Sequence, residues 1–302
     1  MAAFRCLRVI FAVVAMVLAT ASTGFAGDVD VVASGLQFPE GTIFVGNVLY
    51  FVDYAASDVL RLAGGKVERV WHQDGCGANG LVEVQGELLV ACYENGSVVR
   101  ITTGGVLRET IRHDDAGGVF NSPNDLAADR VGGVYFSGSG GAGVLGKVYY
   151  RDSAGHVKLV AANISNANGL AVSKDGKLLY LAESGKRRLL TFDIGAGGGL
   201  SSQTELVKLA DVLADGRHDV FTPDGVRLDG QGRLFVGLYN GGGFAVLTGG
   251  GKLVKMVELP AAHHANLAIS PDGKSVFVTA ADDTPDGSWR GALFKVDNPV
   301  SE

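Results

Sequence analysis

The chain is poor in several residue types and lacks two common catalytic motifs. It holds only 3 cysteines, 3 methionines, 2 tryptophans and 7 prolines among 302 residues. Its cysteines show no C-x-x-C spacing, and no G-x-S-x-G sequence is present, so the nucleophile elbow of serine hydrolases is missing. The formal net charge is −6 and the sequence shows no extended basic patch, so we do not expect nucleic acid as a partner.

Long apolar runs are confined to the first 26 residues. Arg5 and Arg8 precede an apolar run over residues 9–19, and small residues follow it at 19–21 and 24–26. This order is typical of a secretory signal, and the run is short for a membrane-spanning helix, although an uncleaved anchor remains the alternative. We therefore predict a signal peptide over 1–26, a single domain over 27–302, and export to the periplasm or the extracellular space, with no membrane contact once the signal is removed.

The cysteines of the exported part are Cys76 and Cys92, because Cys6 leaves with the signal. An oxidising compartment permits a disulfide between them. The hairpin predicted below sets Cys92 opposite Asn79, three residues from Cys76, and the distance limit for a disulfide is strict. We therefore expect two separate thiols, with the disulfide as the alternative.

Glycine is abundant, at 45 of 302 residues, about twice the average share of roughly 7%. The glycines interrupt runs of β-branched and aromatic residues, which favours short strands joined by tight turns. Along residues 221–237 a polar residue opens an alternating strand, a glycine turn follows, and a second apolar strand comes next. The same pattern recurs six times, at intervals of roughly 40 to 55 residues, and a third and usually a fourth strand follow each copy.

Four short strands at this period predict an all-β fold, a six-bladed β-propeller with four-stranded blades. The sixth copy ends near Val296 without a fourth strand, and residues 28–32 ahead of the first copy can supply it. A ring closed by this N-terminal strand leaves no exposed sheet edge between the first and last blades. An open sandwich, or two separate β domains, is the alternative.

Every copy of the repeat opens with a side chain that carries an oxygen. We call these six the lead residues: Glu40, Asn79, Asn124, Asn168, Asp224 and Asn266. Asn-Gly and Asp-Gly are common turn dipeptides, so a single copy would indicate a turn, but the innermost strands of a propeller all face one axis. Oxygen donors that include two carboxylates suit a hard divalent cation such as Ca²⁺, with Zn²⁺ or Mn²⁺ as alternatives. Such a cation is either catalytic or purely structural.

The segment Asn121–Leu126, together with Val134–Phe136, resembles the signature of the SMP-30/gluconolactonase/LRE-like family, whose members are six-bladed propellers with lactonase activity. The resemblance covers about residues 28–297. It implies that Glu40, Asn168 and Asp224 bind the metal, that Asn124 contacts the metal or the substrate, and that Asp224 is also the catalytic base. Animal members carry an arginine two residues before the third-blade asparagine, where this chain has Ser122.

We predict substrate-binding roles for Asn124, Asn79, Asn266, Ser122 and Tyr239, which open or follow strands at the channel mouth. His263 and His264 precede the sixth copy, and we expect them on the surface or in a loop because no partner carboxylate is visible. Two G-x-G-x-x-G matches, at 75–80 and 138–143, precede strands rather than helices. They are therefore better interpreted as mouth loops with room for a ligand than as dinucleotide sites.

These observations favour a metal-dependent hydrolase that opens a lactone or a related cyclic ester. The cation would act as a Lewis acid and Asp224 as the base. One alternative is a secreted, non-catalytic propeller that binds a small metabolite or a protein and holds a structural Ca²⁺, since a fold does not determine a function. A strictosidine-synthase-like or organophosphatase-like activity is a second alternative. The expected partner is a small molecule, and the oligomeric state stays open.

Overall fold

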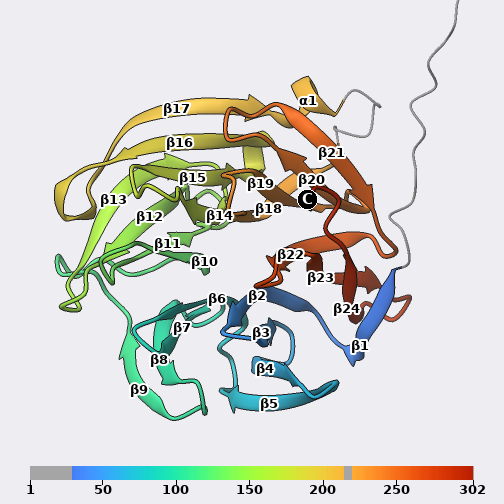
Figure 1. The fold of residues 1–302 in the computed structure, drawn as a ribbon. Helices are drawn as coiled ribbons and strands as arrows, with labels where there is room; N and C mark the ends of the chain where they lie inside the picture. The colour runs from blue at the N-terminus through green and yellow to red at the C-terminus, as the bar shows by residue number, and fades with distance from the viewer. Residues whose placement is uncertain (1–28, 214–219, 302) are drawn as a thin grey trace, which may run out of the picture.

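The computed structural model describes residues 29–213 and 220–301. Six four-stranded antiparallel sheets stand around one axis, and each is a blade of a propeller (Figure 1). The inner strands β2, β6, β10, β14, β18 and β22 lie nearest the centre of the ring. The prediction of a six-bladed β-propeller is confirmed, and the predicted signal peptide lies outside the described residues.

Each of the first three blades is four consecutive strands. Blade 1 contains β2 (Pro39–Val45), β3 (Val48–Asp53), β4 (Asp58–Ala63) and β5 (Lys66–His72). Blade 2 contains β6 (Ala78–Val84), β7 (Glu87–Cys92), β8 (Ser97–Thr102) and β9 (Leu107–Ile111). Blade 3 contains β10 (Pro123–Ala128), β11 (Val134–Gly138), β12 (Gly146–Arg151) and β13 (Val157–Ile164).

The other three blades complete the ring. Blade 4 contains β14 (Ala167–Val172), β15 (Leu178–Glu183), β16 (Arg188–Ile194) and β17 (Leu200–Lys208). Blade 5 contains β18 (Thr222–Leu228), β19 (Leu234–Tyr239), β20 (Gly243–Leu247) and β21 (Leu253–Glu258). Blade 6 contains β22 (His263–Ile269), β23 (Ser275–Asp283), β24 (Trp289–Asp297) and β1 (Asp30–Leu36). The short helices are η1 (Ser184–Lys186), η2 (Ala196–Gly198) and α1 (Leu209–Val212).

The N-terminal strand closes the ring. Strand β1 pairs antiparallel with β24, so the sixth sheet has the order β1-β24-β23-β22 and joins the start of the described chain to its last blade. The sequence predicted this strand from the missing fourth strand of the last repeat, and the structure extends it to Leu36. The ends of the ring are therefore tied by main-chain hydrogen bonds.

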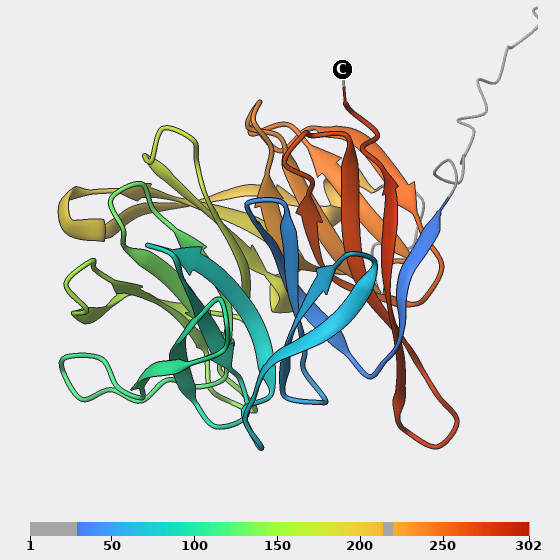
Figure 2. The ribbon, with the colours of Figure 1, turned by 60° about the horizontal axis from the view of Figure 1, so that its bottom comes forward.

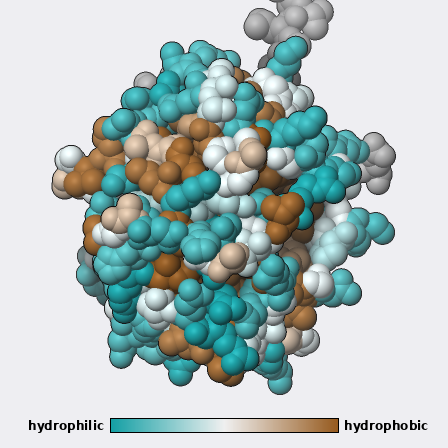
Figure 3. Space-filling model, turned by 90° about the vertical axis from the view of Figure 1, so that its left-hand side faces the viewer, coloured by the Kyte–Doolittle hydropathy of each residue, from teal (hydrophilic) through white to brown (hydrophobic). Residues whose placement is uncertain are grey.

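The hydrophobic core lies between neighbouring blades. One cluster joins Val52 and Val59 of blade 1 to Leu81, Leu88 and Val90 of blade 2, and comparable clusters lie between other pairs of neighbours. The second strand of each blade is packed on both faces, which is why its apolar run is nearly continuous. One side of the ring shows hydrophobic residues scattered among hydrophilic ones (Figure 3).

A β-bulge interrupts every inner strand near its start. In blade 1 Pro39 pairs with Asp53 and Thr42 pairs with Phe51, so two residues between them oppose a single partner. The same interruption occurs in the other five inner strands. Bulges redirect side chains and are frequent next to active sites. In blades 1 to 5 the first residue of the bulge lines the cavity described below.

The glycine after a lead residue lets neighbouring blades approach closely. A Cβ on Gly41 would lie 2.7 Å from the Asn79 carbonyl oxygen, and one on Gly169 would lie 2.2 Å from the Asp224 carbonyl oxygen. Gly80 lies equally tight against blade 3. These Asn-Gly and Asp-Gly pairs therefore serve close backbone packing at the axis rather than turns.

Cys76 and Cys92 form a disulfide, with Cα atoms 4.5 Å apart, so the expectation of two separate thiols is wrong and its alternative holds. The bulge in β6 explains the error, because Cys92 pairs with Ala78 and not with Asn79. That shift brings Cys92 one residue closer to Cys76 in the preceding loop. Both cysteines are fully buried. Within residues 29–213 and 220–301, helices are too short or too polar to cross a membrane.

Candidate functional site

One cavity gathers most of the predicted site residues where the inner strands begin. Its volume is about 360 Å³. Five lead residues and one tyrosine from the prediction line it: Glu40, Asn79, Asn124, Asn168, Asp224 and Tyr239. The five lead residues come from blades 1 to 5, and they meet at the axis because each occupies the bulge of its own inner strand. Tyr239 ends β19, the second strand of blade 5.

Asn266 occupies a different position from the other lead residues, so the predicted register of the sixth blade is wrong. Its neighbour Leu267 pairs with Val278 in the way that Thr42 pairs with Phe51, which makes Ala265 the counterpart of Glu40. The Asn266 side chain is buried and accepts the backbone N–H of Leu267 at 2.9 Å. Asn266 does not line the cavity, and the sixth blade offers a methyl group where an oxygen was expected.

Ser122 also lies outside the lining of this cavity. Its backbone is left-handed, with a φ of 51°, and its carbonyl oxygen accepts the N–H of Ser139 at 2.9 Å. Ser139 is the residue of this loop that reaches the cavity. The role of Ser122 is therefore to shape the loop that carries Ser139, while its predicted contact with substrate stays a prediction.

Glu40 and Asp224 are two buried carboxyl groups with perturbed pKa values. Burial raises the pKa of Glu40 well above its usual value, and the nearby Asp224 and Asp125 raise it further. Burial, reinforced by Asp125, raises the pKa of Asp224 to about 8. Hydrogen bonds from the Asn79 and Asn168 side chains oppose these shifts at Glu40 and Asp224 respectively. Like charges held together in a dry site resist joint ionisation unless a cation joins them.

The donors present fit a divalent cation. The Oδ1 atom of Asn168 is buried, and within the described chain it has no hydrogen-bond partner. An orphaned buried oxygen beside two carboxylates costs about 1–3 kcal/mol, and a hard cation would satisfy it. No group of three or more His, Cys, Asp or Glu side chains forms a metal site in residues 29–213 and 220–301. A cation here would therefore rely on amide oxygens as well as carboxylates.

A buried ion pair that the sequence analysis did not single out lies beneath the cavity. The Arg227 guanidinium donates to both carboxylate oxygens of Asp125. Asp125 raises the pKa values of Glu40 and Asp224, whereas Arg227 lowers them. The signal in the sequence was a departure from the repeat, because Asp125 stands where blades 1, 2, 4 and 5 have glycine.

Aromatic rings line part of the cavity, and only Tyr239 among them was predicted from the sequence. The Phe38 ring lies 6.0 Å from Tyr54 and 5.0 Å from Trp289, centre to centre, and 6.4 Å from Tyr239. All four rings line the cavity. Trp289 begins β24, and the β23–β24 hairpin extends past the neighbouring loops (Figure 2). The lining also includes small polar residues: Ser139, Asn166, Ser184 and Thr222.

His263 and His264 are buried on β22, so their predicted surface or loop position is wrong. His263 stacks on Tyr239 with ring centres 4.5 Å apart, and its Nε2 lies 3.1 Å from the Asp283 carboxylate. His264 Nε2 lies 2.8 Å from the Pro260 carbonyl oxygen, and burial lowers the pKa of His264 to about 4. The partner carboxylate of Asp283 could not be recognised from the sequence because it lies on the next strand, β23.

Fold and site together define a class: six-bladed propellers that bring carboxylate and amide oxygens together where the inner strands begin. The chain belongs to the SMP-30/gluconolactonase/LRE-like family, whose sequence profile matches residues 38–282. The resemblance predicted from Asn121–Leu126 is thereby confirmed.

Related proteins bear out this assignment. The chain is 25% identical to a gluconolactonase of Zymomonas mobilis over 291 residues, which cover 84% of this chain and 79% of that protein. It is 24% identical to the pentonolactonase XacC of Haloferax volcanii, covering 69% and 72% of the two chains. Its fold matches the crystal structure of regucalcin, a calcium-binding protein of Agrobacterium tumefaciens, with a TM-score of 0.68, 19% identity and coverage of 88% and 93%.

Proposed function

We propose that this protein is a lactonase that hydrolyses the cyclic ester in the cavity at the axis. The observation that carries the proposal is the pairing of buried Glu40 and Asp224 with the unpartnered oxygen of Asn168 in an open cavity. The names of its relatives, gluconolactonase and pentonolactonase, agree with this reaction. The absence of a G-x-S-x-G motif agrees with a reaction in which water attacks directly.

We assign Glu40, Asn168 and Asp224 as the residues that hold a divalent cation, and Ca²⁺ is the ion that hard oxygen donors favour. The calcium-binding name of the regucalcin structure supports this choice of ion. Once bound, the cation would polarise the ester carbonyl as a Lewis acid. The aromatic wall around Phe38 excludes water from one side of the cavity and supports the face of the ring substrate.

Asp224 is the proposed base. Its carboxylate takes a proton from water as the water oxygen bonds to the carbonyl carbon of the ester. The ring C–O bond then breaks, and Asp224 returns the proton to the departing ring oxygen, which leaves a hydroxy acid. Asn79 and Asn124 face the same cavity and can donate amide N–H bonds to the substrate.

The protein is proposed to act after export. The N-terminal pattern over residues 1–26 is that of a secretory signal, and it lies outside the described residues. The Cys76–Cys92 disulfide supports the proposal, because such bonds persist in oxidising compartments. Detection of the protein in the periplasm or medium, cleaved near residue 26, tests this point.

Elemental analysis of purified protein, followed by a lactone panel with and without Ca²⁺, Zn²⁺ or Mn²⁺, tests the reaction. Asp224→Asn should lower kcat by about 10²-fold or more, since general-base catalysis contributes roughly 10²–10⁴-fold. The matched control is Asp193→Asn, because Asp193 is exposed on β16, away from the cavity. Turnover that survives both a chelator and the Asp224 variant would contradict the proposal. A chelator that lowers only the melting temperature would assign the cation a structural role.

A further inference from the structure

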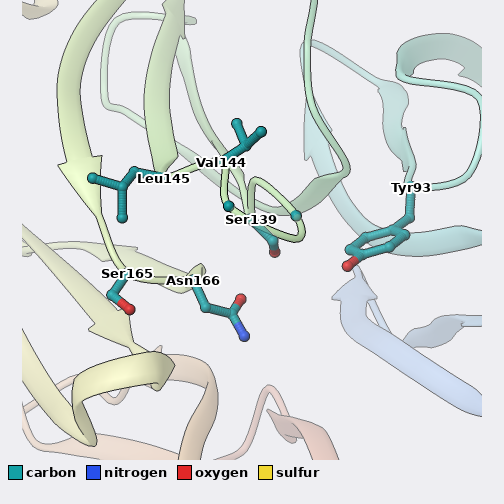
Figure 4. Close-up of a pocket in the computed structure, with 8 residues that line it drawn as sticks. Tyr93, Ser139, Val144, Leu145, Ser165 and Asn166 are labelled. Atoms are coloured by element: carbon teal, nitrogen blue, oxygen red, sulfur yellow. The ribbon is translucent and has the colours of Figure 1, made fainter.

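A second compartment opens beside the candidate site. Its volume is about 380 Å³, and Tyr93, Ser139 and Asn166 line both it and the site cavity. The two spaces therefore lie side by side. Figure 4 shows the Tyr93 ring entering from one side, while Val144 and Leu145 lie across the compartment, above Asn166.

A tight turn holds the two apolar side chains of this compartment. Gly141 and Val144 exchange two backbone hydrogen bonds of 3.0 Å, and Gly143 at the turn has a φ of 75°. Val144 and Leu145 are 47% and 51% exposed, although both belong to an ordered turn that leads directly into β12. Exposed branched side chains beside a binding cavity offer apolar surface to a ligand.

The floor of the turn is anchored to blade 4. The Ser139 hydroxyl donates to the Ala167 carbonyl oxygen at 2.9 Å. A Cβ on Gly146 would lie 2.8 Å from the Ala167 backbone nitrogen, so the chain after the turn passes close to β14. The compartment is therefore bounded by a fixed wall and does not depend on closure of a loop.

The charged side chains that line the two spaces are all acidic. The second compartment is lined by uncharged residues, and the charged side chains lining the site cavity are Glu40 and Asp224, both acids. Within the described lining no lysine, arginine or histidine is available to pair with an anion. A phosphorylated or carboxylated substituent would enter without a positively charged partner and near two acids, an unfavourable arrangement of like charges.

We propose that the second compartment binds an uncharged, apolar substituent carried on the lactone ring, so that the preferred substrates are alkyl- or aryl-substituted lactones rather than sugar or phosphosugar lactones. The proposal rests on the lactonase function and adds the class of substrate. The lactone ring lies over Glu40 and Asp224, and its substituent passes between Tyr93 and Ser139 to contact Leu145.

A chain-length series of five-membered lactones tests this assignment. The probes carry no side chain, an ethyl group or a pentyl group, with a polyhydroxylated γ-lactone for comparison. Burying one methylene contributes roughly fourfold in binding. The value of kcat/KM should therefore rise by about tenfold or more from the unsubstituted to the pentyl lactone, which should also exceed the hydroxylated one. An equal or lower value for the pentyl lactone overturns the proposal.

Variants of Leu145 test whether this turn causes the preference for the longer side chain. Leu145→Ser should reduce the ratio of the pentyl to the unsubstituted kcat/KM by about fivefold, because it removes apolar contact. Leu145→Lys should raise the relative kcat/KM for a γ-lactone whose side chain ends in a carboxylate. The control is Val131→Ser, since Val131 is 75% exposed at the other end of blade 3 and should leave the ratio unchanged. If neither Leu145 variant changes its ratio of kcat/KM values, the proposal is contradicted.

Binding without turnover separates the two hypotheses. The matching five-membered lactams resist hydrolysis, and calorimetry gives their Kd values for the wild-type protein. If lactones are not opened but the pentyl lactam binds about tenfold tighter than the unsubstituted one, the lactonase proposal fails. The assignment of the second compartment to an apolar substituent is then still supported. If the two lactams bind equally, the compartment assignment fails even where lactones are hydrolysed.

Discussion

The guanidinium of Arg227 donates to both carboxylate oxygens of Asp125, at 2.8 and 3.3 Å, and joins two inner strands that are 102 residues apart. Strand β18 carries Arg227 three residues after Asp224, and β10 carries Asp125 one residue after Asn124. The Asp125 carboxylate is 2% exposed. This ion pair thus fixes two strands that each bring a side chain to the cavity, and its positive partner partly offsets the acids of the site.

Arg227→Met should lower the free energy of unfolding by about 3–5 kcal/mol, because it leaves the buried Asp125 charge without its partner. Denaturant unfolding of the chelator-treated protein measures the change. The control is Arg61→Met, which removes an exposed arginine paired with Glu68 and should cost at most about 1 kcal/mol. The double change to Arg227→Met with Asp125→Asn should recover part of the loss. No recovery would mean that the pair is not coupled as the geometry indicates.

Without a bound cation, the free energy of unfolding should fall as pH rises. Burial raises the pKa values of Glu40 and Asp224 in the folded state, to about 8 for Asp224, above their unfolded values near 4. At pH values between the unfolded-state and folded-state pKa values, the metal-free folded state binds more protons than the unfolded state. A rise in pH over this range therefore lowers the free energy of unfolding. The melting temperature in chelator should drop by several degrees from pH 5 to pH 8, and excess Ca²⁺ should reduce the drop.

Other groups also change stability in this range, so the variant decides the cause. His264 acts in the opposite direction, because burial lowers its pKa to about 4 and the unfolded state binds the extra proton. Burial raises the pKa of Asp53, and hydrogen bonds to Asp74 and Asp58 raise that of the exposed His72. Glu40→Gln combined with Asp224→Asn should therefore flatten the pH dependence without eliminating it. The site carboxylates are not its source if the double variant keeps the wild-type slope.

The Cys76–Cys92 disulfide should contribute about 2–3 kcal/mol, the range expected for a cross-link with a sequence separation of 16. Replacing both cysteines with alanine should lower the melting temperature by several degrees, and a reductant should have no further effect on that variant. Since both sulfurs are buried, the folded wild-type protein should react slowly with reductant at room temperature. Rapid reduction of the folded protein, followed by thiol counting, would contradict this expectation.

The repeat made the fold predictable, because every blade buries the same apolar pattern against its neighbours. Glu40, Asn168 and Asp224 could be predicted to lie together for the same reason, because they occupy the same position in their copies of the repeat. The error at Asn266 shows the limit: a polar residue one position later fits the pattern equally well, and only strand pairing reveals that Ala265 occupies the bulge. Sequence periodicity does not resolve a shift of one residue.

Contacts between side chains of different blades could not be predicted from the sequence. Phe38, Tyr54 and Trp289 come from loops and strand ends of blades 1 and 6, and no periodic signal marks residues that meet only when the ring closes. The pairing of Asp125 with Arg227 is equally non-local. Long-range pairing across the axis is set by the three-dimensional ring, so a single sequence gives no evidence of it.

Gly169→Ala should damage the candidate site by forcing two inner strands apart. Its Cβ would lie 2.2 Å from the Asp224 carbonyl oxygen and 2.8 Å from the Gly225 Cα, and backbone atoms cannot move aside as a flexible side chain would. Strand β14 must then shift away from β18, which separates Asn168 from Asp224. We expect a loss of about 1–3 kcal/mol in stability. The Ca²⁺-induced rise in melting temperature should shrink in the same variant.

The matched control for Gly169→Ala is Gly230→Ala. A Cβ on Gly230 meets no heavy atom within 4 Å, and Gly230 is absent from the positive-φ glycines, so this substitution should leave stability within about 0.5 kcal/mol of the wild type. Both variants add one methyl group to blade 4 or blade 5, but only the first lies at the axis. Melting curves with and without Ca²⁺ for the two proteins, read side by side, measure the difference. Equal Ca²⁺ responses would show that close packing at the axis does not position the proposed cation ligands.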